Sequence, residues 1–327
     1  MGNLPSERLS QAFPFINVGC DYAGPFYLKE GKARKPTVTK AWICIFVCMV
    51  TKAVHIELVT ELSTQAFFLC FKRFISRRGK PNMIFSDNGT QFVGSNNELL
   101  NFFKSNGDLI TSHFSNERIT WKFIPPKAPN FGGIWESCVK STKHHLKRII
   151  GNSQLRYEDF STKLCQIESI LNSRPLTPLS SSPDDMSPLT PAHFLIGRPL
   201  TSLPESNYVD IPDGRLKVYQ QRQKMVQLFW KRWSNEYING LQTRLKWKVN
   251  GSNIIKNEAL VLVKEDNVPP LMWKMGRIVS LHPGDDSVVR VVSVRYSDGS
   301  ILKRPVTKVC VLPIDENMNS ICEKKEC

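Results

Sequence analysis

Apolar and polar positions recur with two different periods along the first half of the chain, and together they predict an α/β fold. Short apolar runs with strand spacing occupy residues 15–21, 41–50, 53–59, 81–85 and 120–124, and stretches with helical spacing occupy residues 64–78, 96–104, 134–150 and 157–171. We expect the second and third runs to extend the first strand as an antiparallel sheet, after a basic loop at 29–40. Cys44 and Cys48 share a face of the second run and are predicted core residues.

The helix predicted over residues 64–78 has the clearest boundaries. Ser63 or Thr64 is suited to cap its first turn, and Gly79 is suited to end it. Its apolar side chains recur three or four positions apart and predict one buried stripe, made of Phe67, Phe71, Phe74 and Ile75.

The second half of the chain has a different pattern. Residues 180–191 are rich in Ser, Pro and Asp and predict a loop, and residues 192–213 show no period. Residues 215–248 have helical spacing with nine Lys or Arg and one acid, a net charge of +8. The interleaved Trp230, Trp233 and Trp247 are more suited to packing than to stacking on bases. Short strand patterns follow at 259–265, 273–281, 288–296 and 306–312, with a hairpin turn at 297–300, and they predict a small barrel.

The charge balance narrows the class of partner. Lys and Arg number 44 against 29 Asp and Glu, a formal net charge of +15. Such an excess suits a polyanionic partner, although a merely soluble basic protein fits the charge equally well. The longest apolar run, at 41–50, is too short to span a bilayer, and the N-terminal residues lack an apolar signal segment. The nine cysteines are scattered and show no zinc-ligand spacing, so we expect an intracellular protein with reduced thiols and no zinc site.

Three acidic residues stand where an α/β fold gathers its sites. Asp21 lies at the end of the first predicted strand, Asp87 ends another strand, and Glu136 begins a helix after a Gly-rich loop. Three carboxylates converging there could bind divalent cations such as Mg²⁺. Each also has a structural interpretation, because Asp-Asn-Gly is a common turn and a Glu in a first helical turn complements the helix dipole.

The helix that follows Glu136 carries a possible phosphate-contacting ridge. Lys140, Lys143 and Lys147 share the stripe of Glu136 at 3.6 residues per turn. A solvated face with an ion pair between Glu136 and Lys140 is the alternative. The opposite, apolar face is predicted from Trp135, Cys138, Leu146 and Ile149.

Seven motifs, in order, then give the stretch from residue 18 to residue 200 a close resemblance to the integrases of Bel/Pao-type long-terminal-repeat retrotransposons. They are VGCDYAGPF at 18–26, TKAVHIELV at 51–59, FKRFISRRGKP at 71–81, FSDNGTQFVG at 85–94, FIPPKAPNFGGIWE at 123–136, ILNSRPLTPLS at 170–180 and LTPAHFLIGRPL at 189–200. They cover most of the first two hundred residues and are far more specific than three acids alone.

The resemblance implies a ribonuclease-H-like core with a mixed five-stranded sheet, followed by a basic helical linker and an SH3-like barrel. We expect domains at 1–205, 206–254 and 255–315, with a disordered tail at 316–327. Asp21, Asp87 and Glu136 would be the catalytic residues and would hold one or two Mg²⁺ or Mn²⁺ ions. The implied reaction is trimming of the ends of the element's double-stranded DNA, then attack of the 3′ hydroxyl on target DNA. The expected DNA contacts come from Asn88, Lys140, Lys143, Lys147, Arg222, Lys231 and Arg232.

An active integrase of this kind would work as a homo-oligomer on DNA, without a membrane, in the nucleus after passage through the cytoplasm. Two features depart from the family pattern. Asp87 and Glu136 are 49 positions apart, longer than in retroviral integrases, and residues 95–119 are expected to form a surface insertion. The paired His and Cys of a preceding zinc domain are absent upstream of Asp21, so we expect a fragment, a truncated gene product or a host-captured copy.

Two other functions remain open. The first is a domesticated or truncated DNA- or chromatin-binding protein without catalysis, which the basic linker alone would serve. The second is a ribonuclease H acting on RNA–DNA hybrids, which the SDNGTQF and GGIWE contexts and the basic C-terminal region disfavour.

Overall fold

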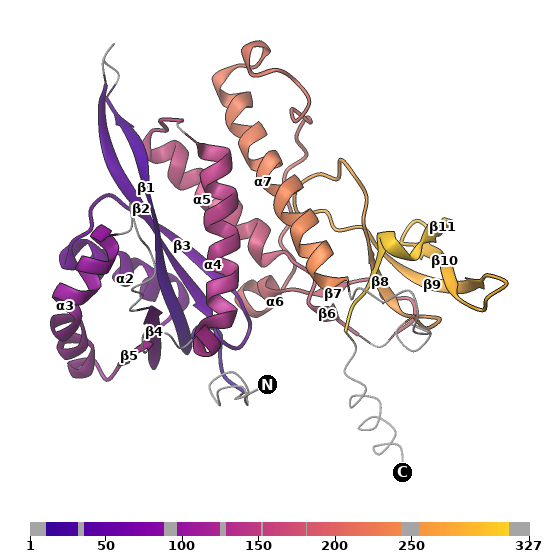
Figure 1. Ribbon diagram of the computed structural model, residues 1–327, viewed down its shortest axis with the longest axis horizontal. Helices are drawn as coiled ribbons and strands as arrows, with labels where there is room; N and C mark the ends of the chain where they lie inside the picture. The colour runs from indigo at the N-terminus through magenta and orange to yellow at the C-terminus, as the bar shows by residue number, and fades with distance from the viewer. Residues whose placement is uncertain are drawn as a thin grey trace. The chain divides into compact units, whose positions relative to one another are not determined.

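The computed structural model describes residues 11–31, 36–87, 97–124, 129–151, 153–180, 182–242 and 255–313, apart from the side chains at 87, 97–100, 102, 103, 124 and 129–138. The described residues form two compact units (Figure 1). The first draws on Met1–Asn172, Phe194–Arg198 and Asn207–Phe229, and the second on Ser173–His193, Pro199–Ser206 and Trp230–Cys327. No helix in these described ranges is both long enough and apolar enough to cross a bilayer.

The first unit is built on a mixed five-stranded sheet, which confirms the expected α/β core. Its strands are β1 (Asn17–Glu30), β2 (Thr37–Cys48), β3 (Val54–Val59), β4 (Met83–Asp87) and β5 (Thr120–Ile124). They lie in the order β3-β2-β1-β4-β5. The first three are antiparallel, as predicted, and β4 and β5 continue the sheet in parallel. β1 is therefore the central strand, with an antiparallel neighbour on one side and a parallel neighbour on the other.

Helices cover both faces of this sheet. They are α2 (Thr64–Arg78), α3 (Asn97–Asn116), α4 (Pro129–Ile150) and α5 (Tyr157–Asn172). α2 and α3 lie on one side of the sheet, and α4 and α5 lie on the other (Figure 1). The predicted ends of α2 are confirmed: the Ser63 hydroxyl accepts the N–H of Ala66, and Gly79 ends the helix with a φ of 90°. Glycine suits that left-handed position because it has no Cβ.

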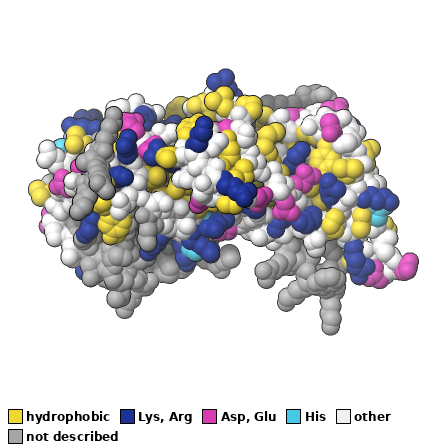
Figure 2. Space-filling model, turned by 90° about the horizontal axis from the view of Figure 1, so that it is seen from above, with side chains coloured by type: hydrophobic (Ala, Val, Ile, Leu, Met, Phe, Trp, Pro, Cys, Tyr) yellow, Lys and Arg dark blue, Asp and Glu magenta, His cyan; other side chains and the backbone are white. Residues whose placement is uncertain are grey.

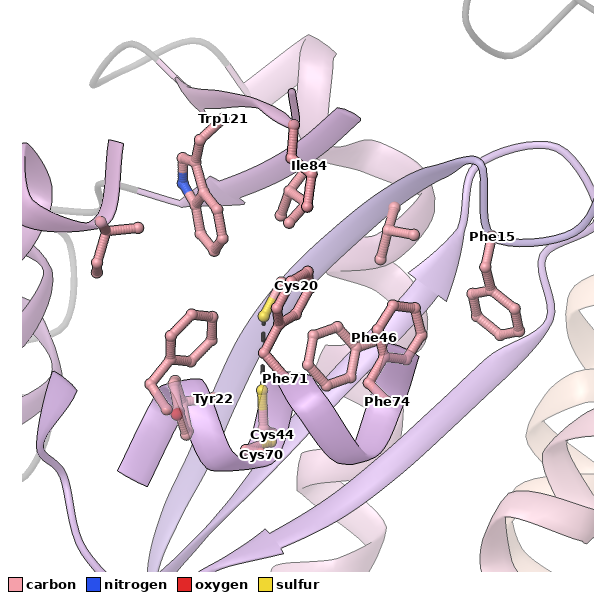
Figure 3. Close-up of a cluster of buried hydrophobic side chains, with 14 of the residues drawn as sticks. Phe15, Cys20, Tyr22, Cys44, Phe46, Cys70, Phe71, Phe74, Ile84 and Trp121 are labelled. Carbon is pink, nitrogen blue, oxygen red and sulfur yellow. Dashed lines mark hydrogen bonds between the residues drawn. The ribbon is translucent and has the colours of Figure 1, made fainter. Parts of the chain in front are cut away.

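The core between α2 and the sheet is rich in aromatic rings (Figure 3). Phe74 stacks on Phe46 of β2 with ring centroids 4.3 Å apart and meets Phe15 edge-on at 5.4 Å. The predicted stripe is confirmed, with Phe67, Phe71 and Phe74 buried and Ile75 partly buried against them. Cys44 and Cys48 are buried, as expected. Burial raises the pKa of the Cys44 thiol, which therefore stays neutral in the core.

The hairpin of β1 and β2 is longer than the sequence predicts. β1 continues to Glu30 and β2 starts at Thr37, so six of the eight described residues of the loop predicted at 29–40 are strand. Phe26 and Leu28 explain the extension, because both are buried and Phe26 packs edge-on against Phe160 of α5 at 5.4 Å. A helix more than a hundred residues later thus stabilises the distal part of the hairpin.

The segment between β4 and α4 differs from two expectations. The helix predicted at 96–104 is confirmed and extends to Asn116 as α3, and its Ile110 and Phe114 are buried, so part of the expected surface insertion belongs to the core. α4 begins at Pro129, inside the predicted Gly-rich loop, and Glu136 lies in the third turn rather than the first. Proline is well suited to start a helix, because its fixed φ is helical and the first N–H has no helical acceptor.

The outer edge of β3 is closed by side chains of α5. The Val54 N–H donates to Asn172 at 2.8 Å, and the Ile56 N–H donates to Glu168 at 2.8 Å. Glu168 also pairs with Arg78 and lies 3.4 Å from the His55 ring. These side chains replace the hydrogen bonds that a sixth strand would otherwise provide, so an exposed sheet edge is avoided.

We expect Glu168→Gln to lower the free energy of unfolding by about 2 kcal/mol, since it weakens hydrogen bonds to two cationic partners and one backbone N–H. Burial alone raises the pKa of Glu168, but hydrogen bonding to His55 and the charges of His55 and Arg78 lower it below 4.5. Burial lowers the pKa of His55, but Glu168 and Glu57 raise it above 6.5.

The stabilisation from Glu168 should therefore be present above pH 4.5 and be lost as the pH falls through its lower folded pKa. The stabilisation from protonated His55 should be complete below pH 6.5 and be lost as the pH rises through its higher folded pKa. Urea unfolding from pH 3 to 9 should show the largest difference between wild type and variant from about pH 4.5 to 6.5. Glu158→Gln, an exposed position of the same helix, is the control. A difference that does not vary with pH would contradict this assignment.

The second unit contains an all-β sheet, as expected for the C-terminal region. Its strands are β8 (Leu260–Val263), β9 (Met275–Pro283), β10 (Val289–Tyr296), β11 (Ile301–Pro305) and β12 (Val309–Val311), in the order β11-β10-β9-β8-β12. A two-stranded ribbon, β6 (Thr177–Pro178) and β7 (Pro188–Leu189), belongs to the same unit.

The turn at 297–300 is confirmed as a hairpin turn, with the Tyr296 N–H donating to the Ser300 carbonyl at 2.9 Å. It leads into β11 and not into the run at 306–312, which starts as a 3₁₀ turn (Val306–Lys308) before β12. The sequence gives no sign of β11 because its side chains are mostly exposed and do not alternate.

Candidate active site

The pairing of β1 with β4 brings two of the predicted acids to neighbouring positions. The parallel register runs from Asn17 opposite Met83 to Cys20 opposite Ser86, and the next residues of the two strands are Asp21 and Asp87. Asp21 therefore lies within β1 and not at its end, because β1 continues beyond this point beside β2 alone. Asp87 is the last residue of β4. Sites in such sheets gather where parallel strands end.

The Asp21 side chain is described in full. It is 25% exposed, and its Oδ2 accepts a hydrogen bond from the Nζ of Lys143 at 2.8 Å. Its Oδ1 accepts the N–H of Tyr22 at 2.6 Å. Each carboxylate oxygen therefore has a donor, and one of these donors is a cation.

Lys143 links the Asp21 position to α4. The stripe of α4 that faces the core consists of Val139, Thr142, Leu146 and Ile150. Burial of Leu146 is confirmed, whereas Ile149 is half-buried, and the side chains of Trp135 and Cys138 lie outside those described. Glu136 lies two turns before Lys143 on the same face of the helix. Lys143 thus brings α4 against β1 at the position of Asp21.

The three lysines of the predicted ridge lie in different environments. Lys140 and Lys147 are exposed, but Lys143 is 27% exposed and forms the ion pair with Asp21. Sequence spacing identified the shared stripe but not this contact, which joins residues 122 positions apart. Contact of these lysines with DNA stays a prediction.

The metal-binding prediction concerns side chains that the structure describes only in part. The carboxylates of Asp87 and Glu136, and all of Asn88, lie outside the described set. Among the side chains described, no group of three or more His, Cys, Asp and Glu is arranged to hold a metal ion. Only the Asp21 side chain allows a test of whether the site suits a metal ion. Its Oδ2 already faces a cation, the Lys143 ammonium, and carboxylate oxygens are ligands that Mg²⁺ prefers.

The basic residues of the predicted linker separate into two groups along α7 (Val218–Leu241). In the first unit, Arg222 forms an ion pair with Asp159, and Lys224 pairs with Asp213 at 2.7 Å. In the second unit, Lys231 and Arg232 are exposed. Lys231 and Arg232 therefore remain the more accessible candidates for phosphate contact.

The two tryptophans of α7 pack, as predicted. Trp230 and Trp233 are buried, and both lie edge-on to Trp273, at 4.7 and 6.1 Å between ring centroids. Trp247 lies outside the described residues, as does the tail at 316–327. On the face drawn in Figure 2, Lys and Arg side chains are dispersed among hydrophobic and acidic ones.

Comparisons with known proteins match a protein family and solved structures. Residues 217–312, less than half of the chain, match a family described as "Family of unknown function (DUF5641)". No curated protein matches the chain. A solved structure of the simian T-cell lymphotropic virus intasome in complex with PP2A regulatory subunit B56 gamma aligns with 93% of this chain and 81% of its own, at 13% identity and a TM-score of 0.35. A superposition this loose does not establish a shared fold.

Proposed function

We propose that this chain is the catalytic core and C-terminal region of a Bel/Pao-type retrotransposon integrase, a polynucleotidyl transferase of the Asp-Asp-Glu type. The observation that carries the proposal is the register of β1 and β4. It makes Asp21 and Asp87 the next residues of adjacent parallel strands, where their pairing ends. The motifs between residues 18 and 200 support the same assignment.

In this proposal the first unit is a ribonuclease-H-like core and the second contains an SH3-like barrel. The strand order, with three antiparallel strands continued by two parallel ones, is consistent with that core. Double-stranded DNA is the proposed substrate, as element ends and as target. Assembly as a homo-oligomer and a nuclear site of action belong to the same proposal.

Asp21, Asp87 and Glu136 would hold one or two Mg²⁺ or Mn²⁺ ions. Such ions, when bound, help to activate a nucleophilic oxygen and stabilise the leaving oxygen in phosphodiester chemistry. Asp21 is oriented by the Tyr22 N–H and by Lys143, which compensates its negative charge. Lys140 and Lys147, both exposed, would contact phosphates, and Asn88 would add a further DNA contact.

Incubation of the purified chain with end-labelled double-stranded DNA of the element's terminal sequence tests this function directly. With Mg²⁺ or Mn²⁺ we expect end trimming and joined products, and with EDTA neither. If DNA binds but is neither trimmed nor joined with either metal, the alternative is favoured, a DNA- or chromatin-binding protein without catalysis. The exposed Lys231 and Arg232 would serve that alternative without the acidic triad.

A further inference from the structure

Two arginines lie opposite each other in the sheet of the second unit. Arg277 of β9 pairs in register with Arg295 of β10. Arg277 is buried and the Arg295 side chain is 35% exposed. Both guanidinium groups carry a full positive charge at any physiological pH. Like charges directly opposite each other across two strands are destabilising, so this pair calls for compensation by an anion.

A short segment of the same unit, Ser182–Ser187, covers the pair and is called here the acidic loop. A terminal nitrogen of Arg277 donates to the carbonyl of Asp185 at 2.7 Å and also to that of Ser182. Arg295 donates to the carbonyl of Pro183 at 3.2 Å. The loop thus supplies three backbone oxygens, which are acceptors without formal charge.

The carboxylates of the acidic loop compensate the charges of the two arginines only weakly. The Asp184 carboxylate lies 3.5 Å from Arg295 but is 89% exposed, and ion pairs of that kind contribute little. The Asp185 carboxylate is used within the loop, where it accepts the Ser187 N–H at 2.8 Å and the Ser180 hydroxyl at 2.7 Å. Among the described residues, Arg295 therefore has one exposed carboxylate at 3.5 Å, and Arg277 donates only to backbone carbonyls.

The hydrogen bonds of the pair are also incomplete. The Nε–H groups of Arg277 and of Arg295 are both buried, and neither has an acceptor in the described part of the chain. A buried donor without a partner costs about 1–3 kcal/mol, and more for a charged group. Such a cost is uncommon at two adjacent residues and indicates a site that is completed by a ligand.

Phosphate is the ligand that this arrangement fits. The planar guanidinium group binds phosphate through two parallel N–H bonds, often including Nε–H, and a phosphate brings the negative charge that the loop carbonyls lack. Lys303 extends the positive surface, because it lies on β11 opposite Ser293, two residues from Arg295 on β10, and is exposed. A strand of phosphates could follow these positions along the face of the sheet.

We propose that Arg277 and Arg295 form a binding site for nucleic-acid backbone phosphate, and that the acidic loop covers this site until phosphate displaces it. The proposal rests on the proposed function, since it names a second DNA contact of that protein outside its active site. The loop would suppress weak, nonspecific binding, because a phosphate must replace its hydrogen bonds before it reaches the arginines.

Binding of the full-length chain to a fluorescent DNA duplex of about 20 base pairs, in EDTA so that no joining occurs, tests the site. Arg295→Gln should weaken binding about 5- to 10-fold and reduce the slope of log affinity against log salt by about one. Arg290→Gln is the matched control, because Arg290 lies on the same strand but is exposed and paired with Asp286. Equal effects of the two variants would overturn the site.

Hydrogen exchange of the wild-type protein tests whether the acidic loop covers the two arginines. DNA should speed the exchange of the Ser187 N–H, which the loop protects through Asp185. Asp184→Asn should raise DNA affinity about threefold or more. This effect should exceed that of Asp286→Asn, at an exposed acid in the turn between β9 and β10. Unchanged or slower exchange at Ser187, or equal effects of the two Asn variants, would overturn the covering role.

The joining assay separates this inference from the proposed function. Normal joining by wild type together with equal binding by Arg295→Gln and Arg290→Gln would refute the arginine site alone. Absence of joining by wild type, with the expected results for Arg295, Asp184 and Ser187, would refute the integrase function and leave the site standing.

Discussion

Replacing Asp21 with Asn should reduce DNA joining by about 1,000-fold or more and leave the fold nearly unchanged. In the proposed site Asp21 supplies one of three carboxylates, and losing a metal-binding charge removes several kcal/mol of transition-state stabilisation. About 1.4 kcal/mol corresponds to each tenfold change in rate, so a loss of about 4 kcal/mol gives this factor.

The stability cost should be small because the Asp21–Lys143 pair is partly exposed on both sides, at 25% and 27%. Pairs of this kind contribute about 1 kcal/mol or less. Joining is measured at saturating metal, and unfolding is measured in urea. Asp108→Asn, at an exposed position of α3, is the matched control and should change neither quantity. Joining at the wild-type rate by Asp21→Asn would exclude Asp21 from the active site.

Replacing Phe74 with Ala should lower the free energy of unfolding of the first unit by about 4 kcal/mol, within the range measured for buried Phe to Ala changes. Phe74 has no exposed surface and contacts the rings of Phe46 in β2, His55 in β3 and Phe15 in the turn before β1. The substitution removes these contacts and leaves a cavity that well-packed neighbours cannot fill.

The control for Phe74→Ala lies on the same helix. Leu69 is 53% exposed, so Leu69→Ala should change the free energy of unfolding by about 0.5 kcal/mol or less. Urea unfolding followed by fluorescence and by circular dichroism measures both variants. A loss below about 2 kcal/mol for Phe74→Ala would mean that the core collapses around the missing ring and is packed less tightly than described.

Local periodicity was sufficient for much of the fold. It predicted a cap at Ser63 or Thr64, the stop at Gly79 and the buried stripe of α2, because each depends on residues within one or two turns. Four of the five strands in the second unit were also predicted, because their apolar residues pack within their own sheet. The sequence also indicated the candidate acids, because acids are scarce in this chain and these three lie beside strand ends or in a helix. They are Asp21, Asp87 and Glu136.

The sequence failed where burial is imposed by a distant segment. The length of β1 depends on α5, whose Phe160 packs on Phe26, and α3 belongs to the core because Ile110 and Phe114 meet α2 and β5. The residues that bury these side chains lie outside the two segments, so local spacing could not identify them. β11 was missed for the converse reason, since an exposed edge strand needs no apolar alternation.

The sequence by itself determined the types of element, the main apolar faces and the acids that form the candidate site. Only the tertiary structure decided which charges meet. Lys143 reaches Asp21 across 122 positions, Arg222 reaches Asp159 across 63, and Arg277 meets the carbonyl of Asp185 across 92. A charged side chain can face solvent, form an ion pair or bind a ligand. The sequence around it does not distinguish these three cases. The packing of the sheets and helices selects among them, because it fixes which oppositely charged groups come within a few ångströms.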